Sequence, residues 1–398
     1  MKKSSGVKPQ VSHFKKLTCS GCSKAYPHNR PQTVCQTCGA PLLAEYDTRA
    51  IGASVKREDL RGRPASIWRY RDFLPLPPTL DPVTLHEGFT PLVRLGREPR
   101  RLKLDELWLK DESKNPGFTF KARGMSVAVS KAVELKLERL ALRSAGNAAA
   151  PFAAYTARAG LRSLIAMPKD APELTLLACE MLGARVSLQR GSLEDCTQFV
   201  QTAALKDGYF DLSSFAEPYR LEGDKTLGME LAEDFNWELP DWVIYPGDGG
   251  MGLIGMWKAW RELEEAGFIG KKRPKLLFVQ GEGCAGIVKA FQSGEDRAET
   301  VTTPTGVAAG LRVGKTLGDN LILRALHESG GAAIAVPDSA IINAMKDLAR
   351  SEGILAAPEG AASLAGLRRA LEQGLIKRSE RIVLVNTNTG LKYANLVR

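Results

Sequence analysis

The sequence predicts an α/β protein with two open parallel-sheet domains, preceded by a small zinc ribbon. Short apolar runs with the character of buried strands alternate with longer segments of helical spacing. That alternation is typical of parallel sheets covered by helices on both faces. The strand candidates are numerous enough to favour two sheets, and four cysteines near the start of the chain have metal-site spacing.

The strand candidates are short runs of apolar residues bounded by polar or turn-forming ones. They lie at 106–110, 162–168, 184–189, 241–246, 275–280, 332–337 and 381–386. Segments with helical spacing lie between them, at 121–136, 147–160, 222–235 and 252–266. We see no internal repeat and no low-complexity tract.

The chain is long enough for more than one domain, with 398 residues of which 44% are hydrophobic. Prolines between residues 73 and 82 prevent regular helix there and indicate a connection. The predicted division is a mobile basic tail at 1–16, a ribbon at 17–48, a linker at 49–84, a large domain at 85–113 and 211–398, and a small domain at 114–210.

The formal net charge of +10 has two interpretations. It could attract nucleic acid or an anionic surface, or it could reflect a basic tail and scattered surface residues. No long basic run is interleaved with aromatic residues, so a nucleic-acid partner is disfavoured, although an anionic cofactor or substrate could use the charge. No apolar run approaches the length of a membrane span, and the start lacks the apolar part of a signal peptide. We therefore expect a cytoplasmic protein without a membrane partner.

Two C-x-x-C pairs occur in "CSGCSKAYPHNRPQTVCQTC". This spacing matches a tetrahedral structural zinc site, in which four thiolates leave no open position for catalysis. Two disulfides are the rival interpretation, disfavoured by a reducing cytosol, and a redox role suits a single pair better. The proposed ligands are Cys19, Cys22, Cys35 and Cys38; the other three cysteines have the pattern of small buried residues.

A glycine-rich turn joins a predicted strand to a predicted helix in "YPGDGGMGLIGMW", residues 245–257. Glycines allow the backbone to approach a ligand closely, and free N–H groups at a helix start can cradle a phosphate. The segment lacks the Gly-Lys-Ser/Thr ending of a Walker loop and the dinucleotide-binding spacing. By itself it is also compatible with an ordinary tight turn.

Two further loops contain candidate reactive side chains. In "SAGNAAAPFAAYTARAG", residues 144–160, Asn147 stands at the start of an alanine-rich helix, where a simple N-cap is the alternative role. In "NPGFTFKARG", residues 115–124, Lys121 lies at a helix start beside apolar neighbours, which disfavour the ammonium form and favour a nucleophilic amine. An exposed lysine on the first helical turn is the plainer reading.

Taken together and in order, these loops resemble the fold type II pyridoxal-phosphate enzymes, the class of the tryptophan synthase β-chain. The resemblance covers residues 85–398 and is greatest to threonine synthase and its relatives. It rests on "HEGFTPLVRL", "KDESKNPGFTFKARG", "EPYRLEGDKTLGMEL" and "VNTNTGLKY". An N-terminal four-cysteine ribbon also occurs on members of this group.

The resemblance implies a role for individual residues. Lys121 would form the Schiff base with pyridoxal phosphate, Asn147 would bond its 3′ oxygen, and Thr387 would face its pyridine nitrogen. Arg220 and Ser144 would bind the substrate. The cofactor phosphate would be held by the backbone of Gly247, Asp248, Gly249, Gly250 and Met251. A neutral partner for the pyridine nitrogen favours elimination and replacement at the substrate side chain, with Lys121 moving protons.

The implied reaction converts O-phospho-L-homoserine and water to L-threonine and phosphate, catalysed by a homodimer. The chain departs from the family pattern at three positions, where Ala148, Phe215 and Asp248 replace residues of the substrate-phosphate site. Losing a hydroxyl donor and gaining a carboxylate both weaken such a site. The alternatives are elimination or replacement at Cβ of another amino acid, as in a serine or threonine deaminase or a cysteate-synthase-like enzyme, and a non-catalytic binding protein.

Overall fold

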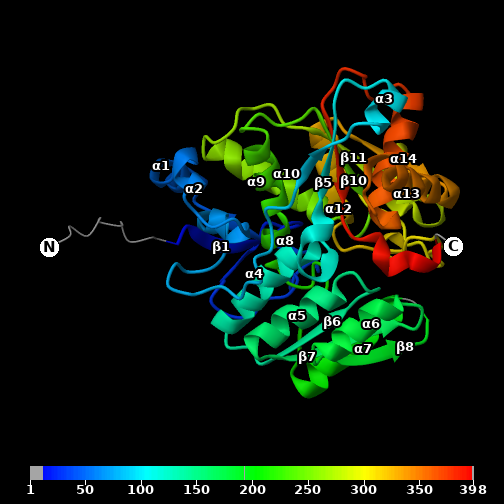
Figure 1. Cartoon of the computed structure of the whole chain (residues 1–398). Coiled ribbons are helices and arrows are strands. Elements are labelled where there is room, and N and C mark those ends of the chain that lie inside the picture. Colours follow the sequence, from blue (N-terminus) through cyan, green and yellow to red (C-terminus); the bar gives the residue numbers. More distant parts are fainter. Residues whose placement is uncertain (1–11, 192, 397–398) are drawn as a thin grey trace.

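The computed structural model describes residues 12–191 and 193–396 and confirms the α/β fold class. Figure 1 shows the ribbon at the left, a four-stranded sheet with its helices at the bottom, and a larger sheet above it. The domain boundaries given above stay predictions. No helix among the described residues has the length and apolar character needed to cross a membrane.

The N-terminal ribbon is an antiparallel sheet of order β2-β1-β3. Its strands are β1 (Phe14–Cys19), β2 (Ala25–Tyr26) and β3 (Leu42–Tyr46). Residues 1–11 of the predicted tail lie outside the described residues. For residues 14–16 the prediction of a tail is wrong, because Phe14 is buried and pairs with Tyr46 across the sheet.

The predicted linker contains α1 (Thr48–Ser54), α2 (Arg57–Arg61) and the 3₁₀ helix η1 (Ile67–Phe73). Residues 74–82 form no helix, as the prolines predict. The segment packs on the body of the protein, since Tyr70 is fully buried and its hydroxyl donates to Glu233 Oε2 at 2.7 Å.

The larger sheet has six strands in the order β12-β11-β10-β13-β5-β4. Its strands are parallel except for the edge strand β4, which runs antiparallel to β5. The strands are β4 (Leu92–Arg94), β5 (Leu107–Asp111), β10 (Trp242–Pro246), β11 (Lys275–Gly281), β12 (Ala332–Val336) and β13 (Ile382–Asn386).

Helices that accompany this sheet come from both halves of the chain. They are α3 (Glu98–Leu102), α8 (Arg220–Asp224), α9 (Thr226–Asp234), α10 (Met251–Glu265), α11 (Gly286–Ser293), α12 (Asp319–Ser329), α13 (Asp338–Glu352) and α14 (Pro358–Glu372). Short 3₁₀ turns lie at the ends of strands and in loops: η2 (Glu112–Lys114), η3 (Pro116–Phe118), η4 (Glu282–Cys284), η5 (Ala309–Leu311) and η6 (Gly390–Leu396).

The smaller sheet is parallel, in the order β8-β7-β6-β9. It consists of β6 (Arg139–Arg143), β7 (Arg162–Pro168), β8 (Arg185–Gln189) and β9 (Phe210–Asp211), with α4 (Lys121–Glu134), α5 (Ala149–Ala159), α6 (Glu173–Met181) and α7 (Leu193–Asp207). All seven predicted strands are confirmed. Strands β4, β6 and β9 were not predicted, because each has only a short apolar stretch.

A buried ionic network fixes the start of α4. Arg123 is fully buried, and its guanidinium donates to both carboxylate oxygens of Glu112 at 2.6 and 2.7 Å. It also donates to both oxygens of Glu230, on α9, at 2.5 and 2.8 Å. Burial alone would raise the pKa of Glu230, but the charges of Arg123 and Lys110 outweigh burial and hold it at about 2. The network therefore joins β5, α4 and α9 two residues from Lys121.

Replacing Arg123 by methionine should destabilise the protein by about 3–5 kcal/mol, because the carboxylates of Glu112 and Glu230 would stay buried without their partner. Chemical denaturation measures the free energy of unfolding. Arg158→Met, on the exposed side of α5, is the matched control and should change stability by less than about 0.5 kcal/mol. Equal stability of the two variants would contradict this role.

Candidate active site

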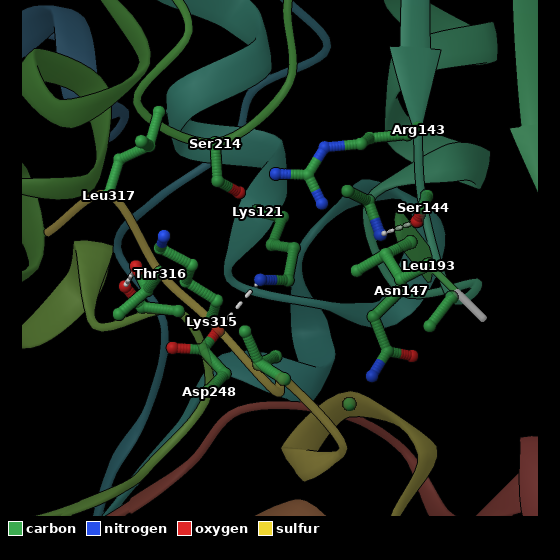
Figure 2. A pocket seen from close by; sticks show the side chains of 15 residues that line it. Lys121, Arg143, Ser144, Asn147, Leu193, Ser214, Asp248, Lys315, Thr316 and Leu317 are labelled. Atoms are coloured by element: carbon green, nitrogen blue, oxygen red, sulfur yellow. Dashed lines mark hydrogen bonds and ion pairs between the residues drawn. The ribbon is translucent and has the colours of Figure 1, made fainter. Parts of the chain in front are cut away.

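One cavity is lined by five of the ten residues predicted to bind cofactor or substrate. Lys121, Ser144, Asn147, Asp248 and Gly249 all line it, although they come from three separate segments of the chain. Figure 2 shows the side chains that surround it, with Lys121 near the centre. The cavity lies beyond the carboxyl ends of β6 and β10, where ligands bind in open α/β sheets.

The turn before Lys121 determines where α4 begins. Gly117 has φ +69°, and a Cβ atom there would lie 2.9 Å from Pro151 Cδ, so the position requires glycine. The Phe120 N–H donates to Thr387 O at 3.1 Å, which ties the turn to the segment after β13. Lys121 is then the first residue of α4, and its side chain enters the cavity.

Lys121 forms an ion pair inside the cavity. Its Nζ lies 2.7 Å from Asp248 Oδ2 and 4.7 Å from the centroid of the Phe120 ring. Only about 15% of the lysine side chain and 11% of the aspartate side chain are exposed. Apolar neighbours were expected from the sequence, and Phe120 is one of them. The structure adds a carboxylate in direct contact with the candidate nucleophile.

The glycine-rich loop connects β10 to α10 and uses several of its own amides. Gly247 N donates to Val279 O at 2.6 Å, Asp248 N to Pro246 O at 2.9 Å, and Gly250 N to Asp248 Oδ1 at 2.9 Å. Within the described residues, the N–H groups of Gly249 and Met251 have no such partner. These two amides, at the positive end of a 15-residue helix, are available to an anion.

Asn147 is held by two side chains that sequence analysis did not single out. Its Nδ2 donates to Glu359 Oε1 at 3.0 Å, and its Oδ1 accepts from Asn388 Nδ2 at 2.6 Å. Glu359 Oε1 also accepts from Gly310 N at 2.8 Å and from the Tyr393 hydroxyl at 2.5 Å. The amide of Asn147 has a second hydrogen, so it can still donate to a ligand.

A second, smaller cavity is lined by Thr387 together with Lys121 and Asn147. Two polar atoms on its lining residues, Thr119 Oγ1 and Glu359 Oε2, are buried without a hydrogen-bond partner among the described residues. Buried polar groups are normally satisfied, so these two indicate a place for ligand or water atoms.

The two predicted substrate-binding residues have different surroundings. Ser144 lines the main cavity, and its hydroxyl accepts from the amides of Gly146 and Ala148 at 3.0 and 3.3 Å. Arg220 is buried and is not among the residues that line the cavity. Its Nη1 donates to Leu212 O at 2.7 Å, which ties the start of α8 to the end of β9.

Burial shifts two ionisable groups close to the cavity. Burial raises the pKa of Asp224 to about 7, although the charges of Arg220 and Lys121 oppose that shift. Asp224 Oδ1 accepts from Gly124 N at 3.1 Å, on the first turn of α4. Burial also lowers the pKa of Lys392 to about 8, and its Nζ donates to Gly117 O at 3.0 Å. Lys392 is thus a second buried amine close to the turn that precedes Lys121.

The four N-terminal cysteines cluster in the ribbon, with all four sulfur atoms within 4.8 Å of one another. The Sγ–Sγ distances are 3.4 Å for Cys19 and Cys38 and 3.6 Å for Cys22 and Cys35. None of the four is in a disulfide. Four sulfurs about 2.3 Å from a tetrahedral zinc lie about 3.8 Å apart, so the cluster has suitable dimensions for that ion.

Comparison with known proteins identifies the class of this fold and site. Residues 83–388 match the family described as pyridoxal-phosphate dependent enzyme, so the chain belongs to that family. The structure of maize serine racemase has a TM-score of 0.64 at 20% identity, over 76% of this chain and 88% of that chain, which shows the shared fold.

Two curated relatives define a narrower group. Threonine synthase from Methanocaldococcus jannaschii is 38% identical over 94% of this chain and 92% of its own length. Threonine synthase from Methanosarcina acetivorans is 36% identical over the same shares of the two chains. The chain is therefore a member of the threonine synthase family of pyridoxal-phosphate dependent enzymes.

The residues at the cavity fit pyridoxal phosphate. A lysine amine is available for the aldehyde, free amides stand at the start of α10 for the phosphate, and the unpartnered Thr119 and Glu359 atoms can meet polar atoms of the ring. Gly249 leaves room for a ligand, since a Cβ atom there would approach only Thr316 Oγ1, at 3.9 Å. The individual contacts assigned from the sequence stay predictions.

Replacing Lys121 by alanine should abolish covalent attachment of pyridoxal phosphate, because this amine lies at the junction of the two cavities. Borohydride reduction followed by peptide mass spectrometry should place the added mass on the Lys121 peptide of the wild type and on no peptide of the variant. Lys392→Met is the control, since it removes a second amine close to the turn before Lys121, and it should keep the label. A label on Lys392 in the wild type would exclude Lys121.

Proposed function

We propose that this enzyme converts O-phospho-L-homoserine and water to L-threonine and inorganic phosphate. The observation that carries the proposal is a lysine cavity of the pyridoxal-phosphate type in a chain that matches threonine synthases over nearly their whole length. In the overall reaction, the phosphate group leaves Cγ with its bridging oxygen, and the hydroxyl group of water is added at Cβ. Atoms balance without an oxidant or reductant.

When bound, pyridoxal phosphate would supply an electron-withdrawing ring that stabilises negative charge at Cα of the substrate. The Lys121 amine would remove and return protons at Cα, Cβ and Cγ. Asn147 can orient the ring from one side, because Glu359 and Asn388 fix its amide. Thr387 offers a neutral hydroxyl, which suits chemistry at the side chain.

The loop that begins at Ser144 is suited to the substrate α-carboxylate. It stands at the N-terminus of α5, where backbone amides and the helix dipole favour an anion. The Ser144 hydroxyl already accepts from Gly146 N and Ala148 N, so its own hydrogen is free to donate to a carboxylate oxygen. The substrate would then extend its side chain past Lys121 into the main cavity.

One observation favours a second candidate, elimination or replacement at Cβ of another amino acid. The Asp248 carboxylate contacts Lys121 at 2.7 Å and lies at the phosphate-binding loop. A carboxylate there opposes a second phosphate near the lysine, and Arg220 does not line the cavity, although Arg143 and Lys315 do. A serine or threonine deaminase would require no such phosphate site.

We also propose that the ribbon holds one structural zinc ion. The support is the four-sulfur cluster and its hydrogen bonds, in which the amides of Gly21 and Cys22 donate to Cys19 Sγ at 3.3 and 3.4 Å. Such bonds stabilise thiolates, the form that binds zinc. Four protein ligands would close the coordination shell, so the ion would stabilise the ribbon and take no part in catalysis.

Incubation of the purified enzyme with O-phospho-L-homoserine should release threonine and inorganic phosphate in equal amounts. Both products are measured in the same sample, with Lys121→Ala as the inactive control. L-Serine and L-threonine are tested in parallel for release of ammonia. Ammonia from these amino acids, without turnover of the phosphorylated substrate, would replace the proposal by the second candidate.

Purified protein should contain one zinc ion per chain, and Cys38→Ser should lose it because three thiolates bind less tightly than four. Elemental analysis measures the metal. Cys284→Ser is the matched control, as this buried cysteine lies far along the chain from the cluster, and it should retain zinc. Full zinc content in Cys38→Ser, or none in the wild type, would contradict the assignment.

A further inference from the structure

The ribbon lies on a buried cluster of four charged side chains in the body of the protein. Lys225 Nζ lies 2.5 Å from Glu222 Oε2 and 2.7 Å from Glu262 Oε2. Lys258 Nζ lies 3.0 Å from Glu222 Oε1 and is also paired with Glu262. Each of the four side chains is at most 6% exposed, so the two positive and two negative charges compensate one another away from water.

Tyr46, the last residue of β3, contacts this cluster with the face of its ring. The ring centroid lies 4.0 Å from Lys225 Nζ and 5.0 Å from Lys258 Nζ. An aromatic face attracts a cation, and the attraction is greatest where water is excluded. The Tyr46 side chain is buried, and its hydroxyl has no hydrogen-bond partner among the described residues. The ring face is therefore the part of Tyr46 that holds the ribbon on the cluster.

A second contact lies at Tyr219, the residue before α8. Its hydroxyl donates to His28 O, in the loop between the two cysteine pairs, at 3.4 Å. Its ring lies 6.3 Å from the ring of Phe14, on β1. Lys131, on α4, has its Nζ 5.4 Å from the Phe14 centroid and 5.3 Å from the Tyr219 centroid. The ribbon, α8 and α4 thus meet at one place, and Figure 1 shows them next to one another.

Helix α8 in turn packs closely against the first turn of α4. A Cβ atom at Gly223 would lie 2.1 Å from Arg123 O, so the two backbones have no space between them at this point. Asp224 Oδ1 accepts from Gly124 N at 3.1 Å. Lys121 is the first residue of α4. A shift of α8 therefore displaces the turn that carries Lys121.

The strands of the ribbon connect the cysteine cluster to this contact. In the register of β1 and β3, Cys19 lies opposite Leu42. At the other end of the same pair of strands, Phe14 lies opposite Tyr46. A sheet of three short strands has little core of its own, so bound zinc would supply much of its stability. Loss of the ion would then loosen the strand that ends at Tyr46.

We propose that Tyr46 is a positioning residue for Lys121, because it holds the zinc-loaded ribbon on α8 and so couples the four-cysteine site to cofactor binding. This inference rests on the proposed zinc site and is independent of which amino acid is the substrate. The zinc ion stays outside the chemistry, and its occupancy acts through α8 on the position of the lysine. Coupling between two sites is reciprocal, so bound pyridoxal phosphate tightens zinc by the same factor by which zinc tightens pyridoxal phosphate.

The test measures the dissociation constant of pyridoxal phosphate by equilibrium dialysis against cofactor-free protein, with zinc content determined in the same samples. The proteins are the wild type, Cys38→Ser, Tyr46→Leu, the double variant of these two, Tyr46→Phe and Glu45→Gln. Glu45 is the matched control, because it is next to Tyr46 on β3 but has a side chain that is 45% exposed and pairs with Lys16.

Cys38→Ser and Tyr46→Leu should each weaken pyridoxal phosphate about 5- to 150-fold, the usual range for coupling between two sites. The double variant should bind no more weakly than the weaker single variant, because both changes act through the same contact. Tyr46→Phe keeps the ring and should bind as the wild type does, as should Glu45→Gln. In Tyr46→Leu, which keeps all four cysteines, zinc affinity should no longer depend on pyridoxal phosphate.

Hydrogen exchange of the cofactor-free protein separates positioning from general destabilisation. In Tyr46→Leu the amides in the first turn of α4 should exchange faster than in the wild type. Those of α13 should be unchanged, since α13 packs in a hydrophobic cluster separate from that of α4. Equal acceleration of both helices would show a general loss of stability and would count against the proposal.

Wild-type affinity for pyridoxal phosphate in Tyr46→Leu would overturn the proposal. So would fully additive effects in the double variant, or a Tyr46→Phe variant as weak as Tyr46→Leu. If the wild type holds no zinc, the zinc assignment fails, and the Tyr46 variants alone decide whether the ribbon positions Lys121. If O-phospho-L-homoserine is not converted, the proposed reaction fails, while the dissociation constants still decide this inference because they require no substrate.

Discussion

The paired burial of Arg123 with Glu112 and Glu230 is the interaction on which the geometry of the site depends. One guanidinium satisfies two carboxylates that come from the end of β5 and from α9. All of these charges are buried, so displacing one of them costs free energy. Removing one partner would leave the other charges buried and unpaired. The first turn of α4 is therefore fixed by electrostatics as well as by packing. Lys121 lies two residues before Arg123, so the same network holds its backbone in place.

Much of this arrangement could be predicted from local patterns. Short apolar runs predicted seven strands, and the structure contains all seven. Parallel strands that are buried on both faces have such continuous runs of apolar residues. Lys121, Asn147 and Asp248 could be found because each follows a strand or opens a helix in a recognisable loop. The ribbon cysteines could be found because zinc geometry constrains their spacing.

Other residues could not be found in that way, because their roles come from contacts between distant segments. Glu359 gives no local signal beyond an acidic residue in the first turn of α14, yet it bonds Asn147, which is 212 positions away. Arg143 and the exposed Lys315 give no local signal either, although both line the main cavity. The contact of Arg220 with a ligand stays a prediction: its Nη1 donates to Leu212 O, while its buried Nε has no hydrogen-bond partner among the described residues.

The pairing of β5 with β13 determines when the site can form during synthesis of the chain. Leu107 to Asp111 lie beside Ile382 to Asn386 in register, so one of the first strands of the large sheet needs the last one as its neighbour. The turn before Lys121 likewise depends on a late residue, because Phe120 N donates a hydrogen bond to Thr387 O. Synthesis adds about 5–20 residues per second, so the roughly 275 residues between these two strands take tens of seconds to make. During that interval a growing chain contains Lys121 but no assembled site around it, and the edge of β5 that later pairs with β13 stays uncovered. The surroundings of the Lys121 amine are thus complete only after β13 and Thr387 have been made.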